Sequence, residues 1–291
     1  MKRSFGENLG HAIIAAVLFI MALVCLYPFW HVFMYSLSDS QAAMGGGFFF
    51  FPRGFSVTQY KVLLRTSNMF RSFMVSLIRV LIGVPFNIIM TATLAYPIAN
   101  RKLPCRGVIS MLVFFTMIFS GGLIPSFLIN RMLGLYNNPL VYLLPGAISA
   151  YNMMVMKSYF ISLPDELSES AQLDGANVLT ILIRIIIPVS IPVIAALAMF
   201  YGVGHWNSWF DGVIYIDSKK WQLFQVFLRG MMMESSYQNL AGISDISDLS
   251  SLTEESVKMA AISMSLVPIL IAYPFIQRYY IKGLMIGAVK G

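Results

Sequence analysis

The sequence predicts an all-α integral membrane protein with six transmembrane helices. Hydrophobic residues make up 58% of the 291 residues and charged residues only 11%, whereas soluble domains carry about a quarter charged residues. Six apolar stretches each reach the length of about 20 residues that a helix needs to cross a bilayer. These stretches are 12–35, 72–99, 107–130, 139–160, 185–207 and 258–279. We expect residues 1–291 to form a single transmembrane domain.

The continuous character of these runs indicates helices, since backbone groups in lipid must be satisfied within the segment. Strands of a membrane barrel would instead appear as segments of about 10 residues that alternate in polarity. The first run, 12–35, is longer than the roughly 7–15 apolar residues of a signal peptide. We therefore interpret it as a retained first span.

Helix-breaking residues interrupt the third, fourth and fifth runs. The third contains Ser120-Gly121-Gly122 and Pro125, where the helix could kink or unwind. The fourth and fifth contain Pro145, Pro188 and Pro192. We expect these spans to be less regular than the others.

The loops between the runs differ in length and charge. Residues 36–71 form a medium loop, and residues 208–257 form the longest polar stretch, rich in Ser and Asp around 244–256. Six spans place both termini on one side, but Lys and Arg are almost equally numerous on the two sides. The short basic turn 100–106 contains no acid and favours cytoplasmic termini, because short loops count most in this bias.

One polar interruption, residues 161–184, reads as two short helices joined at a turn. Ser162, with an aspartate three residues later, resembles a capping box. Acidic residues as far as Glu169 suit the N-terminal half of a helix. Gly175 is expected to end that helix in the left-handed conformation. A second helix is then expected to start near Ala176 and to continue into the fifth span.

The spacing in this segment resembles the EAA loop of ABC importer permeases. That pattern is Glu-Ala-Ala, two residues, Asp-Gly-Ala, and a proline at the twentieth position. The sequence has Glu169-Ser170-Ala171, then Asp174-Gly175-Ala176, and Pro188 at position twenty. Only Ser170 departs from these core positions. An amphipathic helix lying on the membrane is the alternative, but such helices are usually rich in Lys and Arg.

The resemblance extends to the carbohydrate-importer permeases similar to the smaller permease of the maltose system. Residues 51–60, Trp206-Asn207 and the tail 277–283 are similar to elements of that family. Residues 119–125 and 255–260 point to a subgroup associated with polysaccharide or oligosaccharide uptake. The fold implied is that of a type I ABC importer permease, with a cytoplasmic coupling-helix loop.

The same resemblance implies a function and partners. The chain would be the permease subunit of an ATP-driven, binding-protein-dependent importer of oligosaccharides or polysaccharide fragments in a bacterial plasma membrane. It would pair with a second homologous permease, two ATP-binding subunits and an extracytoplasmic sugar-binding protein. It would not be an enzyme and would hold no cofactor, since ATP and Mg bind to the partner ATPase. The sequence has no Walker-type phosphate-binding loop.

In that family the first helix of the loop docks on the ATPase and transmits its closure to the spans, which places the loop in the cytoplasm. The resemblance therefore implies a set of ATPase-coupling residues. They are Glu169, Ser170, Ala171, Asp174, Gly175, Ala176 and Pro188.

Five further residues are candidates for the substrate path: Arg79, Asn87, Asn130, Trp206 and Asn207. A charge such as Arg79 costs roughly 2.5–3.5 kcal/mol at a span centre. It either faces the path or a partner, or extends to the headgroups. Asparagine amides in spans more often join helices than bind ligands, and interfacial aromatic residues are common without a ligand.

Two alternative functions stay open. A permease of the same fold could import peptides or other small solutes. A secondary transporter would need ion-coupling carboxylates inside its spans, yet the 13 acidic residues all lie outside the expected span interiors. The three histidines and two cysteines have no metal-ligand spacing.

Overall fold

The computed structural model describes residues 5–233 and 252–288, and throughout these ranges the regular elements are helices. One isolated antiparallel bridge joins Ser38 and Phe55. Most of the Ser- and Asp-rich part of the loop 208–257 lies outside the described residues. Contacts divide the chain into two compact units, and the expected single domain therefore stays a prediction. Unit 1 is Met1–Phe70 with Leu228–Pro268, and unit 2 is Arg71–Phe227 with Ile269–Gly291.

Unit 1 is built on one long apolar helix. Its elements are α1 (Phe5–Ser36), α2 (Ser40–Ala43), α3 (Thr58–Arg65), most of α13 (Phe224–Met233) and the first part of α15 (Glu254–Ala288). Buried hydroxyls join three of its segments: Ser36 Oγ lies 2.6 Å from the Tyr60 hydroxyl, and Ser263 Oγ donates to Ser36 Oγ at 3.1 Å.

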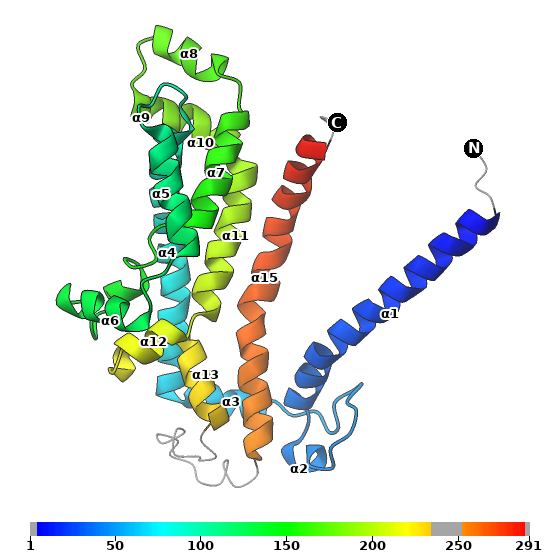
Figure 1. The fold of residues 1–291 in the computed structure, drawn as a ribbon. Coiled ribbons are helices and arrows are strands. Elements are labelled where there is room, and N and C mark those ends of the chain that lie inside the picture. The colour runs from blue at the N-terminus through cyan, green and yellow to red at the C-terminus, as the bar shows by residue number, and fades with distance from the viewer. Residues whose placement is uncertain (1–4, 234–251, 289–291) are drawn as a thin grey trace. The chain divides into compact units, whose positions relative to one another are not determined.

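Unit 2 is a group of helices that runs between two structured ends. Figure 1 shows α4 (Ser67–Ala99), α5 (Arg106–Ile118), α7 (Ala150–Ser162) and α11 (Ile191–Asn207) side by side. At one end lie α8 (Glu166–Leu173) and α9 (Val178–Ile181), followed by a π-helical turn (Leu182–Ile186) and α10 (Ile187–Val189). At the other end lie α6 (Leu123–Met132), η1 (Pro139–Tyr142), α12 (Phe210–Tyr215) and η3 (Lys219–Trp221).

The apolar core of unit 2 lies close to α8. It combines Ala92, Ala95 and Ile98 of α4 with Met153, Met156 and Phe160 of α7 and with Leu197 of α11. Ala171 of α8 belongs to the same core. The helices therefore join the loop 161–184 to the rest of unit 2 through direct packing.

Three helices confirm the predicted spans in length and apolar character. Residues Gly10–Ser36 of α1, Ser67–Ala99 of α4 and Glu254–Pro274 of α15 are each long enough to cross a bilayer. Two bent helix pairs are further candidate spans: α5 and α6 are bent by 113°, and Val178–Val189 and α11 are bent by 84°. Among the described residues, three to five spans are thus counted by length and composition.

The breaks have local causes that the sequence indicates. Gly122 has a φ of +86°, which favours glycine, and it separates α5 from α6. The Val178–Asn207 pair contains the π-turn, Pro188 and Pro192. Residues 139–160 are not one helix, because η1 ends at Tyr142 and α7 begins at Ala150. The 13 residues of α7 reach only about 20 Å, so the count of six spans stays a prediction.

Candidate functional site

The loop 161–184 contains a helix that ends in a tight, fully hydrogen-bonded turn. Helix α8 runs from Glu166 to Leu173, and Gly175 follows with a φ of +82°. The Gly175 N–H donates to the Gln172 carbonyl at 3.0 Å, and the Ala176 N–H donates to the Ala171 carbonyl at 2.9 Å. This pair of bonds is the Schellman motif, which fixes the direction of the chain after a helix. The predicted break at Gly175 is confirmed.

The predicted capping box at Ser162 is wrong. Ser162 ends α7, where its hydroxyl donates to the Tyr159 carbonyl at 2.7 Å. An extended Leu163 and then Pro164 separate it from α8, which begins without a side-chain cap. The second helix, predicted to start near Ala176, begins at Val178, two residues later. Its cap is Asn177, whose Oδ1 accepts the Thr180 N–H at 2.8 Å.

Most of the predicted coupling residues are exposed. Ala171 is buried against the core of unit 2, and Ala176 is partly buried. Glu169, Ser170, Asp174 and Gly175 are exposed, and Pro188 is exposed in α10. Leu173, on the last turn of α8, is 90% exposed. Thus α8 is attached through one small residue and presents acidic, small and apolar groups outward.

Along most of its length, α4 carries a buried polar stripe. Its members are three, four or eight residues apart, which places them on one face of the helix. They are Ser72, Ser76, Arg79, Asn87 and Thr91, each at most 8% exposed. Buried polar groups require partners, and most of these groups bond to other elements of unit 2.

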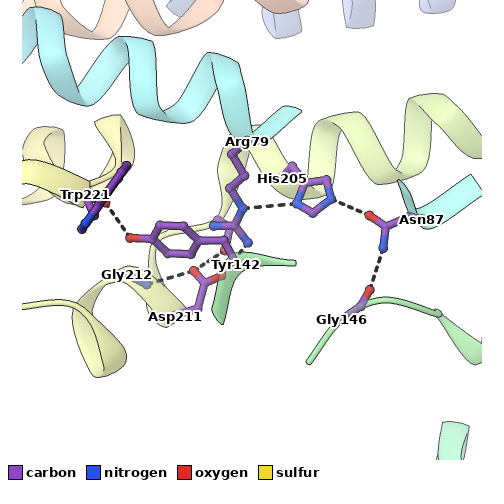
Figure 2. Close-up of polar contacts among 9 residues, drawn as sticks. Arg79, Asn87, Tyr142, Gly146, His205, Asp211, Gly212 and Trp221 are labelled. Atoms are coloured by element: carbon purple, nitrogen blue, oxygen red, sulfur yellow. Dashed lines mark hydrogen bonds and ion pairs between the residues drawn. The ribbon is translucent and has the colours of Figure 1, made fainter. Parts of the chain in front are cut away.

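Arg79 is the centre of this polar network (Figure 2). Its Nη2 pairs with Asp211 Oδ2 of α12, and its Nε donates to His205 Nδ1 of α11 at 3.2 Å. The guanidinium carbon lies 4.6 Å from the centre of the Tyr142 ring, within the range of a cation–π interaction. The Tyr142 hydroxyl in turn donates to the Trp221 carbonyl at 2.8 Å.

The network defines the protonation of His205. Asn87 Nδ2 donates to the carbonyls of Gly146 and Ala147, at 2.8 and 2.9 Å. Asn87 Oδ1 is therefore the acceptor that faces His205 Nε2, 2.6 Å away. Since Arg79 donates to Nδ1, His205 is neutral and carries its proton on Nε2.

A glycine allows His205 to approach α4. A Cβ atom at Gly83 would lie only 2.6 Å from His205 Nε2. Gly83 falls between Arg79 and Asn87 on the same face of the helix. A side chain at position 83 would therefore displace the imidazole from both of its partners.

Asp211 is held in place by the start of its own helix. Its Oδ1 accepts from Ser208 Oγ at 2.6 Å and from the Gly212 N–H at 2.9 Å, while Oδ2 faces Arg79. One cation and one anion thus neutralise each other. The arrangement joins α4, α11, α12 and the segment between η1 and α7.

A second polar contact lies about one turn further along the stripe. The Tyr201 hydroxyl of α11 is 2.7 Å from Thr91 Oγ1 and accepts the Ser149 N–H at 3.1 Å. It joins the same three segments as Asn87. On the α12 side, Tyr136 donates to Asp217 at 2.6 Å, and this hydrogen bond raises the pKa of the Tyr136 hydroxyl above its ordinary value.

The structure unites two of the five predicted path residues. Arg79 and Asn87 meet through His205. Trp206 is buried, and its ring contacts those of Phe73 and Phe224. Asn207 is exposed at the end of α11. Asn130 is buried near the end of α6.

Sequence reasoning did not assign Tyr142, His205 or Asp211 to the site. The sequence does hold one signal for the network. Arg79, Gly83 and Asn87 are spaced four residues apart, a polar and small stripe within a long apolar helix. Such a stripe indicates a face turned toward other helices.

Comparisons with known proteins place this geometry in context. Residues 54–285 match the family model described as "Binding-protein-dependent transport system inner membrane component". The chain is 36% identical over 286 residues to the polygalacturonan/rhamnogalacturonan transport system permease protein YtcP of Bacillus subtilis (strain 168), which covers 98% of this chain and 99% of YtcP. It is 38% identical over 269 residues to Protein LplC of the same organism, covering 92% and 90% of the two chains.

One solved structure is similar over nearly its whole length. It is described as a bacterial ABC transporter involved in the import of the acidic polysaccharide alginate. The TM-score is 0.88 at 29% sequence identity, and the match covers 96% of this chain and 99% of the other.

Proposed function

This chain belongs to the family of binding-protein-dependent transport system inner membrane components, and on that premise we propose that its cargo is an oligosaccharide or polysaccharide fragment. As a member of that family it is a membrane permease of an ABC importer and not an enzyme. The observation that carries the proposed cargo is the likeness to YtcP along almost the entire chain. The structural relative likewise takes part in the import of a polysaccharide, alginate.

The proposed topology has six spans with both termini in the cytoplasm. The helix pair α5–α6, the segment from η1 to α7, and the helices α9–α11 supply the third, fourth and fifth spans. Cytoplasmic termini place the loop 161–184 inside the cell and the Arg79 network toward the outside. The proposed partners are a second homologous permease, two ATP-binding subunits, which hold ATP and Mg, and an extracytoplasmic sugar-binding protein.

Helix α8 is the proposed docking element for the ATPase. Three features support this role: the Schellman turn at Gly175, the exposure of Glu169 and Leu173, and the attachment of α8 through Ala171. A rigid, exposed helix that shares a core with α7 and α11 through Ala171 can transmit a displacement to those helices. Its acidic first turn also suits a basic surface on the partner.

Arg79 and Asn87 are proposed to position the path rather than to touch cargo. Both hydrogen-bond to other parts of this chain, and Arg79 is only 8% exposed. A sugar hydroxyl would have to displace these bonds. Asn207, two residues after His205 and exposed, is the predicted path residue best placed to meet a ligand.

The coupling proposal is tested by uptake into proteoliposomes that contain the complete transporter. Gly175→Val should abolish uptake while membrane insertion stays intact, because valine is strained at a φ of +82° and the turn after α8 is lost. Gly134→Val is the matched control. Gly134 also has a positive φ, +70°, and a Cβ there would meet open space as at Gly175, but it lies at the other end of unit 2.

Wild-type uptake by the combined variant Glu169→Trp/Gly175→Val would refute the coupling role. Equal losses in Gly175→Val and Gly134→Val would assign the effect to backbone strain instead. The cargo is tested separately with the wild-type transporter, using uronate oligosaccharides, neutral oligosaccharides and peptides. Uptake of peptides alone would replace the carbohydrate proposal without affecting the coupling proposal.

A further inference from the structure

An aromatic loop of unit 1 folds back along the end of α1. The Tyr27 ring centre lies 5.6 Å from that of Phe48 and 5.7 Å from that of Phe50. The Trp30 Nε1–H donates to the Phe50 carbonyl at 3.0 Å. Tyr27 precedes the end of α1 at Ser36 by nine residues, or about 13 Å along the helix. The loop therefore returns alongside the span instead of extending away from it.

One residue of the loop fixes it to the helix. Phe49 is 1% exposed, and its ring meets those of His31 and Tyr35 with centres 5.3 and 4.9 Å away. Arg53 places its guanidinium 4.3 Å from the centre of the Phe49 ring and donates to the Gly46 carbonyl at 2.8 Å. The position of the loop along α1 is thus set by packing and hydrogen bonds.

The surface of α1 changes character just beyond this contact. Its apolar side chains are exposed from Ile13 to Phe33, whereas Met34, Tyr35 and Ser36 are buried. The span Gly10–Ser36 has 27 residues and measures about 40 Å, roughly 10 Å more than the hydrocarbon core of a bilayer. A hydrocarbon core that begins near Gly10 ends near Trp30, at the level of the loop.

The outward side of the loop suits lipid headgroups. Four phenylalanines are 61–79% exposed: Phe48, Phe50, Phe51 and Phe55. An irregular backbone does not lie in lipid hydrocarbon, whereas aromatic side chains gather at the interface. From residue 40 to residue 71 the chain has no acid, and it carries Arg53, Lys61, Arg65 and Arg71. Basic groups are attracted to an anionic lipid surface.

We propose that residues 44–55 are a membrane-interface anchor that binds lipid headgroups at the C-terminal end of α1. The last turn of α1 then stands above the hydrocarbon. This explains why Ser36 can be buried against Tyr60 and Ser263 in a polar cluster there. Residues 44–55 are accordingly a lipid-bound segment rather than a freely solvated one.

The test measures the accessibility of nitroxide spin labels in the complete transporter in nanodiscs that contain phosphatidylglycerol. The background carries Cys25→Ala and Cys105→Gly, the latter because Cys105 has a φ of 56°. Labels are placed at Phe51→Cys and, independently, at Phe55→Cys. Leu18→Cys on α1 is the lipid reference, and Lys102→Cys in the exposed basic turn is the water reference.

For each label we measure the ratio of collisions with oxygen to collisions with a water-soluble nickel chelate. We expect this ratio to be at least threefold higher for both loop labels than for the Lys102 label. Unlike the Leu18 label, they should also collide with a chelate carried on a lipid headgroup. A ratio equal to that at Lys102 would place the loop in water and overturn the proposal. Low accessibility to all three reagents would show that another protein chain covers the loop, which also overturns it.

Discussion

Arg79 on α4 and Asp211 on α12 form a buried ion pair between residues 132 positions apart in the sequence. The side chain of Arg79 is 7% exposed and that of Asp211 is 23% exposed. Each charge has further partners: His205 and the Tyr142 ring for the cation, Ser208 and the Gly212 N–H for the anion. The cost of placing an arginine in a span is therefore offset within the same chain.

Removing one member of this pair should destabilise unit 2. Arg79→Leu leaves the Asp211 carboxylate without its cation. We expect a loss toward the lower end of the roughly 3–5 kcal/mol typical of broken buried pairs, because Asp211 is partly exposed. The double variant Arg79→Leu/Asp211→Leu should recover much of this loss, since apolar replacement of a whole pair is often neutral. Thermal and denaturant unfolding of the purified protein in nanodiscs measures both.

A second ion pair provides the control. Lys258 and Glu254 pair across one helical turn of α15, with side chains 25% and 36% exposed. Glu254→Gln should change stability by no more than about 0.5 kcal/mol. If Arg79→Leu lost no more stability than Glu254→Gln, the buried pair would not stabilise unit 2. The same would follow if the double variant were less stable than Arg79→Leu alone.

Gly83 should be intolerant of even one methyl group. A Cβ at this position lies 2.6 Å from His205 Nε2 and 2.9 Å from its Cδ2, and both atoms belong to a ring held by Arg79 and Asn87. We expect Gly83→Ala to cost about 1–3 kcal/mol, as overpacking does, measured as a lower unfolding temperature. Gly204→Ala on α11 is the matched control, since nothing lies within 4 Å of its Cβ.

The control should leave stability unchanged or raise it by up to about 1 kcal/mol, because alanine favours a helix over glycine. A combined Gly83→Ala/His205→Ala variant should lose less than the sum of its two single changes, since the clash disappears with the ring. Strict additivity would show that the methyl group acts elsewhere.

The sequence predicts the long helices well and the network poorly. Helices α1, α4 and α15 could be predicted from long apolar runs, because length and hydropathy are enough to identify them as spans. The turn at Gly175 could be predicted from one residue, because glycine readily adopts the positive φ at which a helix ends. Asp211 could not be assigned to Arg79, because 132 positions separate them and only the packing of α11 and α12 on α4 brings them together.

The irregular spans are an intermediate case. Gly122 and Pro188 mark where the third and fifth runs break, yet bends of 113° and 84° depend on tertiary contacts. Hydropathy did not reveal that 139–160 holds a short 3₁₀ turn and a 13-residue helix. An apolar run indicates that the segment is buried in lipid or protein. Whether it forms one straight helix depends on the elements that pack against it.

Tyr201 should contribute to stability mainly through its hydroxyl. That oxygen accepts the Ser149 N–H and bonds to Thr91. Tyr201→Phe leaves the backbone donor and the threonine without this partner, which should cost about 1–3 kcal/mol. Tyr159→Phe is the matched control, because the Tyr159 hydroxyl makes one exposed bond of 3.4 Å to Val189. Equal unfolding temperatures for the two variants would contradict the role of Tyr201.

Leu173 should be the apolar contact of α8 with the proposed ATPase. It is 90% exposed in this chain, and burying a leucine stabilises a complex by about 1.5–3 kcal/mol. Leu173→Asp should therefore weaken binding of the ATP-binding subunit about 10- to 100-fold, measured by titration of that subunit onto nanodisc-bound protein. The fold should be unaffected, since the side chain packs on little within unit 2.

Met132→Asp, at a residue 86% exposed at the other end of unit 2, should leave this affinity unchanged. Loss of binding in Met132→Asp but not in Leu173→Asp would move the docking surface away from α8.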